Sequence, residues 1–517
     1  MKFNTKSLLY GTLILTAANF IVRFLGFIYR IFLSRMIGPQ GMGLIQLIFP
    51  VYMITVTLTA SGIPIAVSRI VAQRKAINDE QGVRRVVRIA LLLVTFIAFF
   101  LSGLILLNAD TIAANVLHDA RTRIPLMVFF PSIFIAGCSA IFKGYFYGLK
   151  NIHPSAFSEI IEQIIRIMLV TGILLSFPSL GTEASATVVV LCMVIGELCS
   201  LLYLHTRYHK HIAKKYASAA TPSNMMLSKQ IFLIAVPVTL TRLISALMMS
   251  ANSILIPQRL MVGGMPQHEA IGTFGIISGM VMPLLFLPFT LISALSVIII
   301  PNLSENVMLK NWTMIRDKIS KSIFITCLTA LPCMGLFISL GAPIGLALYR
   351  QPAVGNYLIP LAWSIIFICL QHNLSSILNG LGKQNRAAVH FIIGGLVQLG
   401  CTYFLVADPA FGIYGFIIGF ILSGILVASL NLTAVIRIAK LPFQWNKWIV
   451  KPASASCLMA LAIRLLFILL MRLGFSYTLS LAIALPVGFT VLAFTLLALG
   501  SIPFWLIKEV RKKLSGR

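Results

Sequence analysis

Long uninterrupted apolar runs dominate the sequence, each about 20 residues long and separated by short polar or Gly/Pro-containing turns. An apolar helix of that length crosses the roughly 30 Å hydrocarbon core of a bilayer. The runs lack the period-two alternation of a β-barrel, and the charged fraction of 10% is far below the roughly 25% of soluble domains. We therefore expect an all-α polytopic membrane protein, and soluble enzymes and secreted disulfide scaffolds are excluded.

Turn signals between the apolar runs divide the chain into about fourteen spans. Six spans form a predicted N-lobe (1–205) and six a predicted C-lobe (230–437), joined by a basic cytoplasmic linker (206–229). The last two spans, within 452–507, are an appendage. The predicted spans are 8–33, 42–66, 87–107, 125–149, 156–177, 185–205, 230–256, 272–299, 320–341, 356–380, 387–406, 412–436, 452–472 and 477–507.

Basic residues indicate the orientation of these spans. The net charge is +28, and 29 of the 41 Lys and Arg residues fall in segments on the same side of the membrane as the N-terminus. Six fall on the opposite side and six lie inside spans. Because cytoplasmic loops collect Lys and Arg, we expect a multi-pass protein of the cytoplasmic membrane with both termini in the cytoplasm. The charge is then a topology signal, and nucleic acid is not an expected partner.

A weak internal repeat relates the two predicted lobes. Ile124-Pro125-Leu126 opens span four and Gly148-Leu149 closes it, and the tenth span has the same pattern in Ile359-Pro360-Leu361 and Gly380-Leu381. Both copies occur at the same stage of their lobe, so the repeat is parallel. Parallel repeats about an axis along the membrane normal are typical of transporters.

Soluble catalytic motifs are missing from the sequence, including GxxxxGK[ST], a Rossmann glycine pattern and HExxH. The eight cysteines lie in apolar runs without a CxxC pair, which is typical of small buried hydrophobes rather than of disulfides or metal ligands. We therefore expect no cofactor, no metal and no enzymatic activity. A secondary transporter driven by an ion gradient or by the membrane potential fits these absences.

Charged residues inside apolar helices are the best functional candidates, because an arginine at the bilayer centre costs about 2.5–3.5 kcal/mol on insertion scales. Asn19, Arg23, Gly26 and Arg30 share one face of the first span. We interpret them as a cationic stripe that binds an anionic substrate such as phosphate. Arg242 in span seven would add positive charge from the second lobe. The alternative is that Arg30 reaches to the membrane interface and Arg23 only pairs within the bundle.

Acidic residues in spans five and six are candidates for coupling or gating. Glu162 and Arg166 are four residues apart and can pair on one helix. That pair would leave Glu159 without an obvious partner, so Glu159 is a candidate carrier of a proton or an ion. Glu197 is expected to pair with a basic residue of span one or five, and Lys143 is expected to extend to the inner interface.

The stretch NFIVRFLGFIYRIFLSRMIG (19–38) and the segments at 23–44, 61–72 and 142–167 carry a family resemblance. With the six-plus-six-plus-two layout, they resemble the polysaccharide exporter branch of the multidrug/oligosaccharidyl-lipid/polysaccharide (MOP) flippase superfamily. Within that branch the chain is similar to the stage V sporulation protein B-like group, and MurJ-type lipid II flippases are related. The resemblance implies a flippase that moves an undecaprenyl-diphosphate-linked cell-wall precursor by alternating access, with lipid II for spore cortex peptidoglycan as the implied cargo.

The resemblance also bears on individual positions. The MurJ-type flippases have an arginine before a Leu-Gly-Phe motif, which Arg23 matches. Their next cavity arginine falls on Tyr29 here, with Arg30 one place further on. Their basic residue in the middle of the second helix has no counterpart in 49–59. Their last two helices form a groove for the lipid tail, which implies the same role for 452–507.

Two alternatives to a lipid-linked glycan flippase remain open. One is a cation-coupled multidrug exporter of the same superfamily, which would need acids in its cavity. The other is a non-transporting scaffold that binds cell-wall synthesis or sporulation proteins. Such proteins are also expected partners of a flippase.

Overall fold

A computed structural model of the chain describes residues 5–212 and 223–500, without the side chains of 5–20, 297 and 298. Helices account for nearly all of these described residues, as the apolar runs predict. Contacts divide the chain into two compact units, unit 1 (Met1–Gly275) and unit 2 (Ile276–Arg517). Part of the predicted linker, 213–222, lies outside the described residues.

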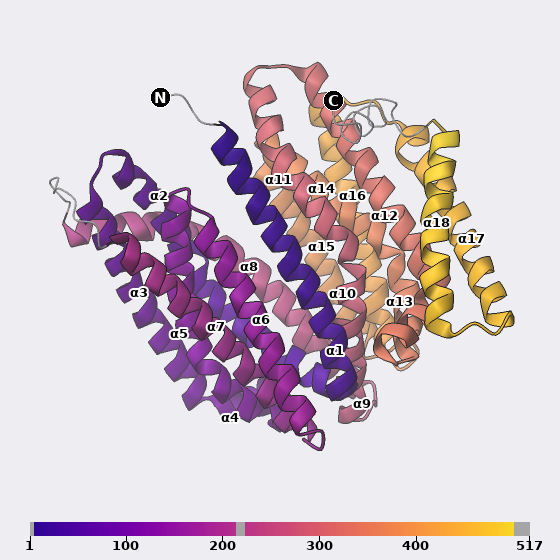
Figure 1. Ribbon diagram of the computed structural model, residues 1–517, viewed down its shortest axis with the longest axis horizontal. Helices are drawn as coiled ribbons and strands as arrows, with labels where there is room; N and C mark the ends of the chain where they lie inside the picture. Colours follow the sequence, from indigo (N-terminus) through magenta and orange to yellow (C-terminus); the bar gives the residue numbers. More distant parts are fainter. Residues whose placement is uncertain (1–4, 213–222, 501–517) are drawn as a thin grey trace. The chain divides into compact units, whose positions relative to one another are not determined.

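In unit 1, α3, α5, α7 and α6 lie side by side in that order (Figure 1), and α1 packs against α5, α6 and α7. The helices α8 and α9 pack against α1, and α8 also contacts α2. Valine, isoleucine and aromatic side chains of α2, α3, α5, α7 and α8 form a continuous core. The helices of unit 1 are α1 (Thr5–Ala60), α2 (Gly62–Ala76), α3 (Glu80–Leu107), α4 (Ala109–Thr111), η1 (Ile112–Val116), η2 (Ala120–Thr122), α5 (Arg123–Gly148), α6 (His153–Ser176), α7 (Thr182–Ile212), α8 (Asn224–Val262) and α9 (Gln267–Gly275).

The long helix α1 is two helices joined at a kink. Gly38 has φ 67° and ψ −176°, and Pro39 follows it directly. Glycine tolerates this positive φ, while proline has no N–H to continue the helical hydrogen bonds. The two predicted spans 8–33 and 42–66 therefore lie on opposite sides of the kink.

Glycines let α8 and α9 come very close to α1 and α2. A Cβ atom at Gly43 would overlap the backbone carbonyl oxygen of Ile271 on α9, and a Cβ at Gly275 would overlap the carbonyl oxygen of Pro39. At Gly62 on α2, a Cβ would overlap the carbonyl oxygen of Ala235 on α8. Small residues at helix crossings allow this backbone contact in membrane proteins.

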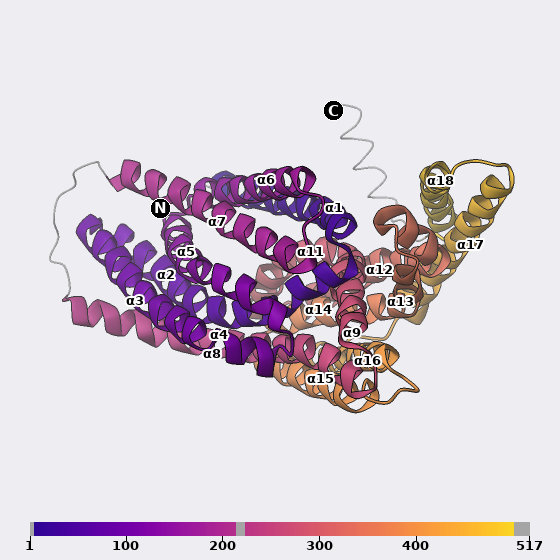
Figure 2. The ribbon, with the colours of Figure 1, turned by 90° about the horizontal axis from the view of Figure 1, so that it is seen from below.

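In unit 2, α14 lies against α11, α12 and α16, and α15 pairs with α16. The helices α17 and α18 pair with each other at the edge of the unit and pack on α12 (Figure 2). The helices of unit 2 are η3 (Ile276–Val281), α10 (Met282–Leu285), α11 (Leu287–Met308), α12 (Trp312–Tyr349), α13 (Ala353–Ala362), α14 (Ser364–Gly380), α15 (Gln384–Leu405), α16 (Ile413–Ala439), η4 (Asn446–Val450), α17 (Lys451–Arg472) and α18 (Tyr477–Ala498).

The two copies of the predicted repeat have similar local structures. Gly148 ends α5, and a Cβ there would lie 2.6 Å from the carbonyl oxygen of Ser68 on α2. Gly380 ends α14, and a Cβ there would lie 3.1 Å from the carbonyl oxygen of Ile300 on α11. Each helix thus ends in a close glycine contact with an earlier helix of its own unit, which supports the repeat.

Twelve helical segments in the described part of the chain are long and apolar enough to cross a membrane. The number becomes thirteen if the pair α13–α14, bent by 51°, counts as one span. The helix α6 is not among them, although its 24 residues extend about 36 Å, because it carries three charged residues. The predicted class, an all-helical polytopic membrane protein, is confirmed, while the count of about fourteen and the lobe boundaries stay predictions.

The crossing of α1 and α9 can be tested with one methyl group. We expect Gly43→Ala to destabilise the protein by about 1–3 kcal/mol, because the methyl overlaps backbone that cannot turn away. Gly103→Ala on α3 is the matched control, since no atom lies within 4 Å of the added Cβ. Thermal unfolding in detergent measures both variants. Equal melting temperatures for Gly43→Ala and wild type would show that the two helices are not in backbone contact.

Candidate functional site

A buried carboxylate links three helices of unit 1. Glu197 on α7 is 6% exposed. The Tyr52 hydroxyl, from the part of α1 that follows the kink, donates a 2.8 Å hydrogen bond to its Oε1. The Ser132 hydroxyl of α5 donates to its Oε2. The expectation that Glu197 pairs with a basic residue is wrong. Within the described residues Glu197 forms no salt bridge, because hydroxyls of α1 and α5 donate to both of its carboxylate oxygens.

The ion pair predicted on α6 is present beside this carboxylate. Arg166 Nη2 lies 2.5 Å from Glu162 Oε1, one helical turn away. Gly196 brings α7 close to this pair, since a Cβ there would lie 2.9 Å from the Glu162 carbonyl oxygen. Both charges of the pair are close enough to Glu197 to interact with it electrostatically. Three ionised or ionisable groups therefore meet at the junction of α6 and α7.

A second ion pair connects α5 to α6. Lys143 Nζ donates to Glu159 Oε1 over 3.1 Å, and the two side chains are 21% and 28% exposed. The expectation that Glu159 lacks a partner is therefore wrong, and so is the expectation that Lys143 simply extends to the interface. They lie sixteen residues apart on separate helices, so local spacing could not reveal the pair.

The predicted cationic stripe lies on the first half of α1. Arg23 is exposed and Arg30 is half-buried. Between them, Gly26 faces α6, where a Cβ would lie 3.6 Å from Nε2 of Gln163. The side chain of Asn19 lies outside the described residues. Whether the two arginines bind substrate stays a prediction.

Two buried polar atoms near this stripe lack partners. The hydroxyl of Tyr29 on α1 and Nε of Arg166 on α6 are buried, and neither has a hydrogen-bond partner among the residues described. Arg166 is close enough to Tyr29 to interact with it electrostatically. Leaving a buried polar group unsatisfied costs about 1–3 kcal/mol. An additional polar group between α1 and α6 would therefore be stabilised here.

The remaining predicted binding residue, Arg242, lies on α8. This helix packs on α1 and α2 in unit 1, and two of its contacts lie on either side of Arg242 in the sequence: Ser250 Oγ donates to the Pro50 carbonyl oxygen over 3.3 Å, and Ala235 lies against Gly62. Arg242 is exposed. It has no hydrogen bond or ion pair in the part of the chain that the structure describes. Although it belongs to the predicted second lobe, α8 is part of unit 1 by its contacts.

Sequence reasoning missed the uncharged partners in both units. Tyr52 and Ser132 are separated in sequence from Glu197, which accepts their hydrogen bonds, so no helical spacing connects them. Unit 2 has a comparable network: Asn373 Nδ2 donates to the Thr326 hydroxyl, and Asn373 Oδ1 accepts from the Ser322 hydroxyl, each over 2.8 Å. Thr326 and Ser322 both lie on α12. A polar residue inside an apolar run was the available signal, but it does not identify a partner.

Comparisons with known proteins identify the family that has this architecture. The family described as "Polysaccharide biosynthesis protein" matches residues 8–307, more than half of the chain. The chain belongs to this family. The family MatE matches 237–404.

Relatives and a solved structure agree with this assignment. The chain is 28% identical over 446 residues to stage V sporulation protein B of Bacillus subtilis, covering 86% of each protein. It is 25% identical over 425 residues to the lipid II flippase MurJ of the same organism, covering 76% of each. A structure titled "Lipid II flippase MurJ, inward closed conformation" matches with a TM-score of 0.70 and 16% identity, covering 93% of this chain and 98% of that one. The predicted membership of the MOP superfamily is confirmed, and the chain is a membrane transport protein rather than an enzyme.

The carboxylate of Glu197 gives a test of the site's architecture. We expect Glu197→Ala to destabilise the protein by about 1–3 kcal/mol for each buried hydroxyl that loses its acceptor. The matched control is Glu269→Ala, because this carboxylate is 59% exposed and its nearest basic partner is a histidine. Thermal unfolding of purified protein measures the effect, and equal destabilisation by both variants would contradict the role of Glu197 in joining α1, α5 and α7.

Proposed function

We propose that the protein is a flippase for an undecaprenyl-diphosphate-linked cell-wall precursor, working by alternating access in the cytoplasmic membrane. Lipid II used for spore cortex peptidoglycan is the proposed cargo. The similarity to stage V sporulation protein B and to the lipid II flippase MurJ supports this class of cargo. We also propose that both termini lie in the cytoplasm and that cell-wall synthesis or sporulation proteins are partners.

The charge balance within unit 1 is the observation that carries this proposal. The two acids of α6 and the acid at the centre of α7 each have a partner: Glu159 has Lys143, Glu162 has Arg166, and Glu197 has two hydroxyls. The acids are thus engaged within the protein. The residues of the predicted binding site include three arginines, Arg23, Arg30 and Arg242, and no acid, which favours an anionic cargo over a cationic one.

Arginine suits the proposed headgroup. A guanidinium stays ionised at all physiological pH values and binds phosphate oxygens in a bidentate manner. A diphosphate carries about two negative charges, so it needs such groups to enter a low-dielectric region. We propose that Arg23, Arg30 and Arg242, with Asn19 and the space left by Gly26, hold the diphosphate during transport. The lipid tail would stay in the bilayer, with the α17–α18 hairpin as its groove.

We assign the coupling of transport to its driving force to the ion pairs of unit 1. Glu159, Glu162, Arg166 and Glu197 lie on the two helices that pack beside α1, so a change in their pairing would alter how α1 sits in the unit. Moving one charge across the membrane is worth about 2.3 kcal/mol per 100 mV. We propose that the membrane potential resets the empty cationic site after the anion has been released.

The MatE match over 237–404 favours a second candidate, a cation-coupled multidrug exporter. Such an exporter recognises cationic drugs with carboxylates. The engagement of Glu159, Glu162 and Glu197 argues against it. Export of a cationic dye by the reconstituted protein, unaffected by Arg23→Ala, would favour the exporter.

Transport by purified protein tests the flippase proposal. We expect vesicles that contain the full chain to expose labelled lipid II on the opposite leaflet, with a rate that depends on an imposed membrane potential. Arg23→Ala should lower that rate by tenfold or more because a phosphate contact is lost. Arg88→Ala is the matched control, since Arg88 is an exposed arginine of α3 outside the proposed site.

The outcomes separate the three functions. Protein-dependent movement that survives in Arg88→Ala and is lost in folded Arg23→Ala supports the flippase. Folded wild-type protein that moves neither lipid II nor a cationic dye would contradict it and favour a scaffold.

A further inference from the structure

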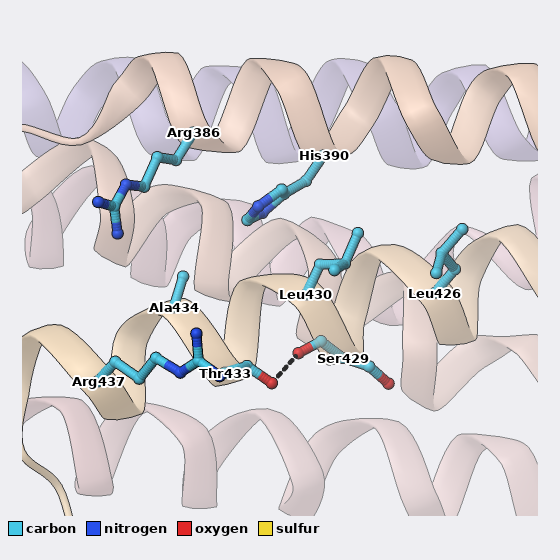
Figure 3. Close-up of a pocket in the computed structure, with 8 residues that line it drawn as sticks. All are labelled: Arg386, His390, Leu426, Ser429, Leu430, Thr433, Ala434 and Arg437. Carbon is cyan, nitrogen blue, oxygen red and sulfur yellow. Dashed lines mark hydrogen bonds between the residues drawn. The ribbon is translucent and has the colours of Figure 1, made fainter.

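A cationic pocket lies in unit 2, away from the residues proposed to bind cargo. It has a volume of about 590 Å³ and lies between α15 and α16 (Figure 3). Arg386 and His390 extend into it from α15, and Ser429, Thr433 and Arg437 line the facing side on α16. Nothing in the proposed flippase cycle uses these residues.

The two arginines of this pocket are not engaged by the protein. Both guanidiniums are exposed, and neither takes part in a hydrogen bond or an ion pair within the described part of the chain. The sequence from 364 to 440, which covers α14 to α16, contains a single acid, Asp408. Asp408 lies in the connection at the opposite ends of α15 and α16 from Arg386 and Arg437. Positive charge at the pocket is therefore not neutralised by these helices.

The pocket is cationic at one end and apolar at the other. Arg437 and Arg386 lie where α16 ends and α15 begins, on the side predicted to face the cytoplasm. Leu430 and Leu426 continue the wall on α16, and Leu426 is eleven residues, or about 16 Å along the axis, from Arg437. The outer surface beside it is also apolar, with Val389 54% and Ile425 38% exposed. An occupant therefore needs an anionic group at the interface and an apolar chain that continues into the membrane.

The deeper polar residues are held in place by neighbours. The His390 ring is oriented by Asn431, whose Oδ1 lies 2.8 Å from its Nδ1. Asn431 is itself fixed because its Nδ2 donates to the Ser375 hydroxyl over 3.0 Å. Thr433 Oγ1 donates to the Ser429 carbonyl oxygen over 2.8 Å. The pocket is thus built on a fixed polar network, which distinguishes it from two arginines that merely extend from helix ends.

From these observations we propose that the pocket binds the phosphate headgroup of an anionic phospholipid in the cytoplasmic leaflet. Arg386 and Arg437 contact the phosphate from two helices, and an acyl chain lies over Leu430 and Leu426. Basic pockets between transmembrane helices on the cytoplasmic side recognise anionic headgroups in this way. Such a lipid would join α15 to α16 at the interface and is separate from the transported cargo.

Lipid binding to the purified full-length chain tests this site. We expect wild-type protein in neutral detergent to bind phosphatidylglycerol at least tenfold more tightly than phosphatidylcholine, measured by native mass spectrometry. Arg386→Gln with Arg437→Gln should lose that preference. Lys383→Gln with Lys440→Gln is the matched control, because it removes the same charge from exposed residues of the same two helix ends outside the pocket. It should change the affinity by less than about threefold, since exposed charges are screened by salt.

A second variant keeps the charge and fills the space. Ser429→Phe leaves both arginines in place and should also abolish the preference for phosphatidylglycerol. Ser429 is exposed on α16, so this change tests the pocket even if the double arginine variant does not fold. Equal weakening by the arginine pair and the lysine pair would overturn the proposal in favour of general surface attraction. Full displacement of the lipid by inorganic phosphate, or by undecaprenyl diphosphate at lower concentration, would also overturn it, the first indicating a free-anion site and the second a cargo site.

Discussion

A membrane interior offers no water to charged groups, and this constraint governs the polar parts of the structure. Every carboxylate of α6 and the centre of α7 is matched by a donor from another residue: Lys143, Arg166, or the two hydroxyls that contact Glu197. Removing one partner of a buried charge is costly, whereas a complete network is tolerated. The polar contacts of unit 1 therefore fix the positions of α5, α6 and α7 around the kinked helix α1.

Close helix packing is the second requirement. Apolar helices gain little hydrophobic free energy by contacting each other instead of lipid, so helix association depends on contact area and hydrogen bonds. The glycines at 43, 62 and 275 meet this requirement by allowing backbone contacts of α1 and α2 with α8 and α9. The kink at Gly38 lies beside two of these contacts.

Charge is distributed differently in the two units. Unit 1 contains acids and bases in its helices, and they are largely paired with each other. In unit 2, the interior hydrogen bonds of Asn373 with Thr326 and of Asn431 with Ser375 join neutral side chains, while the arginines of α15 and α16 lie at the helix ends. The proposed cargo site and the proposed lipid site therefore differ in their residues and in the unit that supplies them.

The sequence by itself determined the class of the protein and the Glu162–Arg166 pair. These features depend on the local hydrophobic run, on turn residues and on spacing within one helix. It did not reveal the Lys143–Glu159 pair or the hydroxyl partners of Glu197, because these join helices that are remote in sequence. It also did not indicate the pocket of Arg386 and Arg437, which lie 51 residues apart and meet only because α15 and α16 pack antiparallel. Only the tertiary structure decides such pairs. The cost of burying a charge requires that a partner exists, but it does not determine which helix supplies that partner.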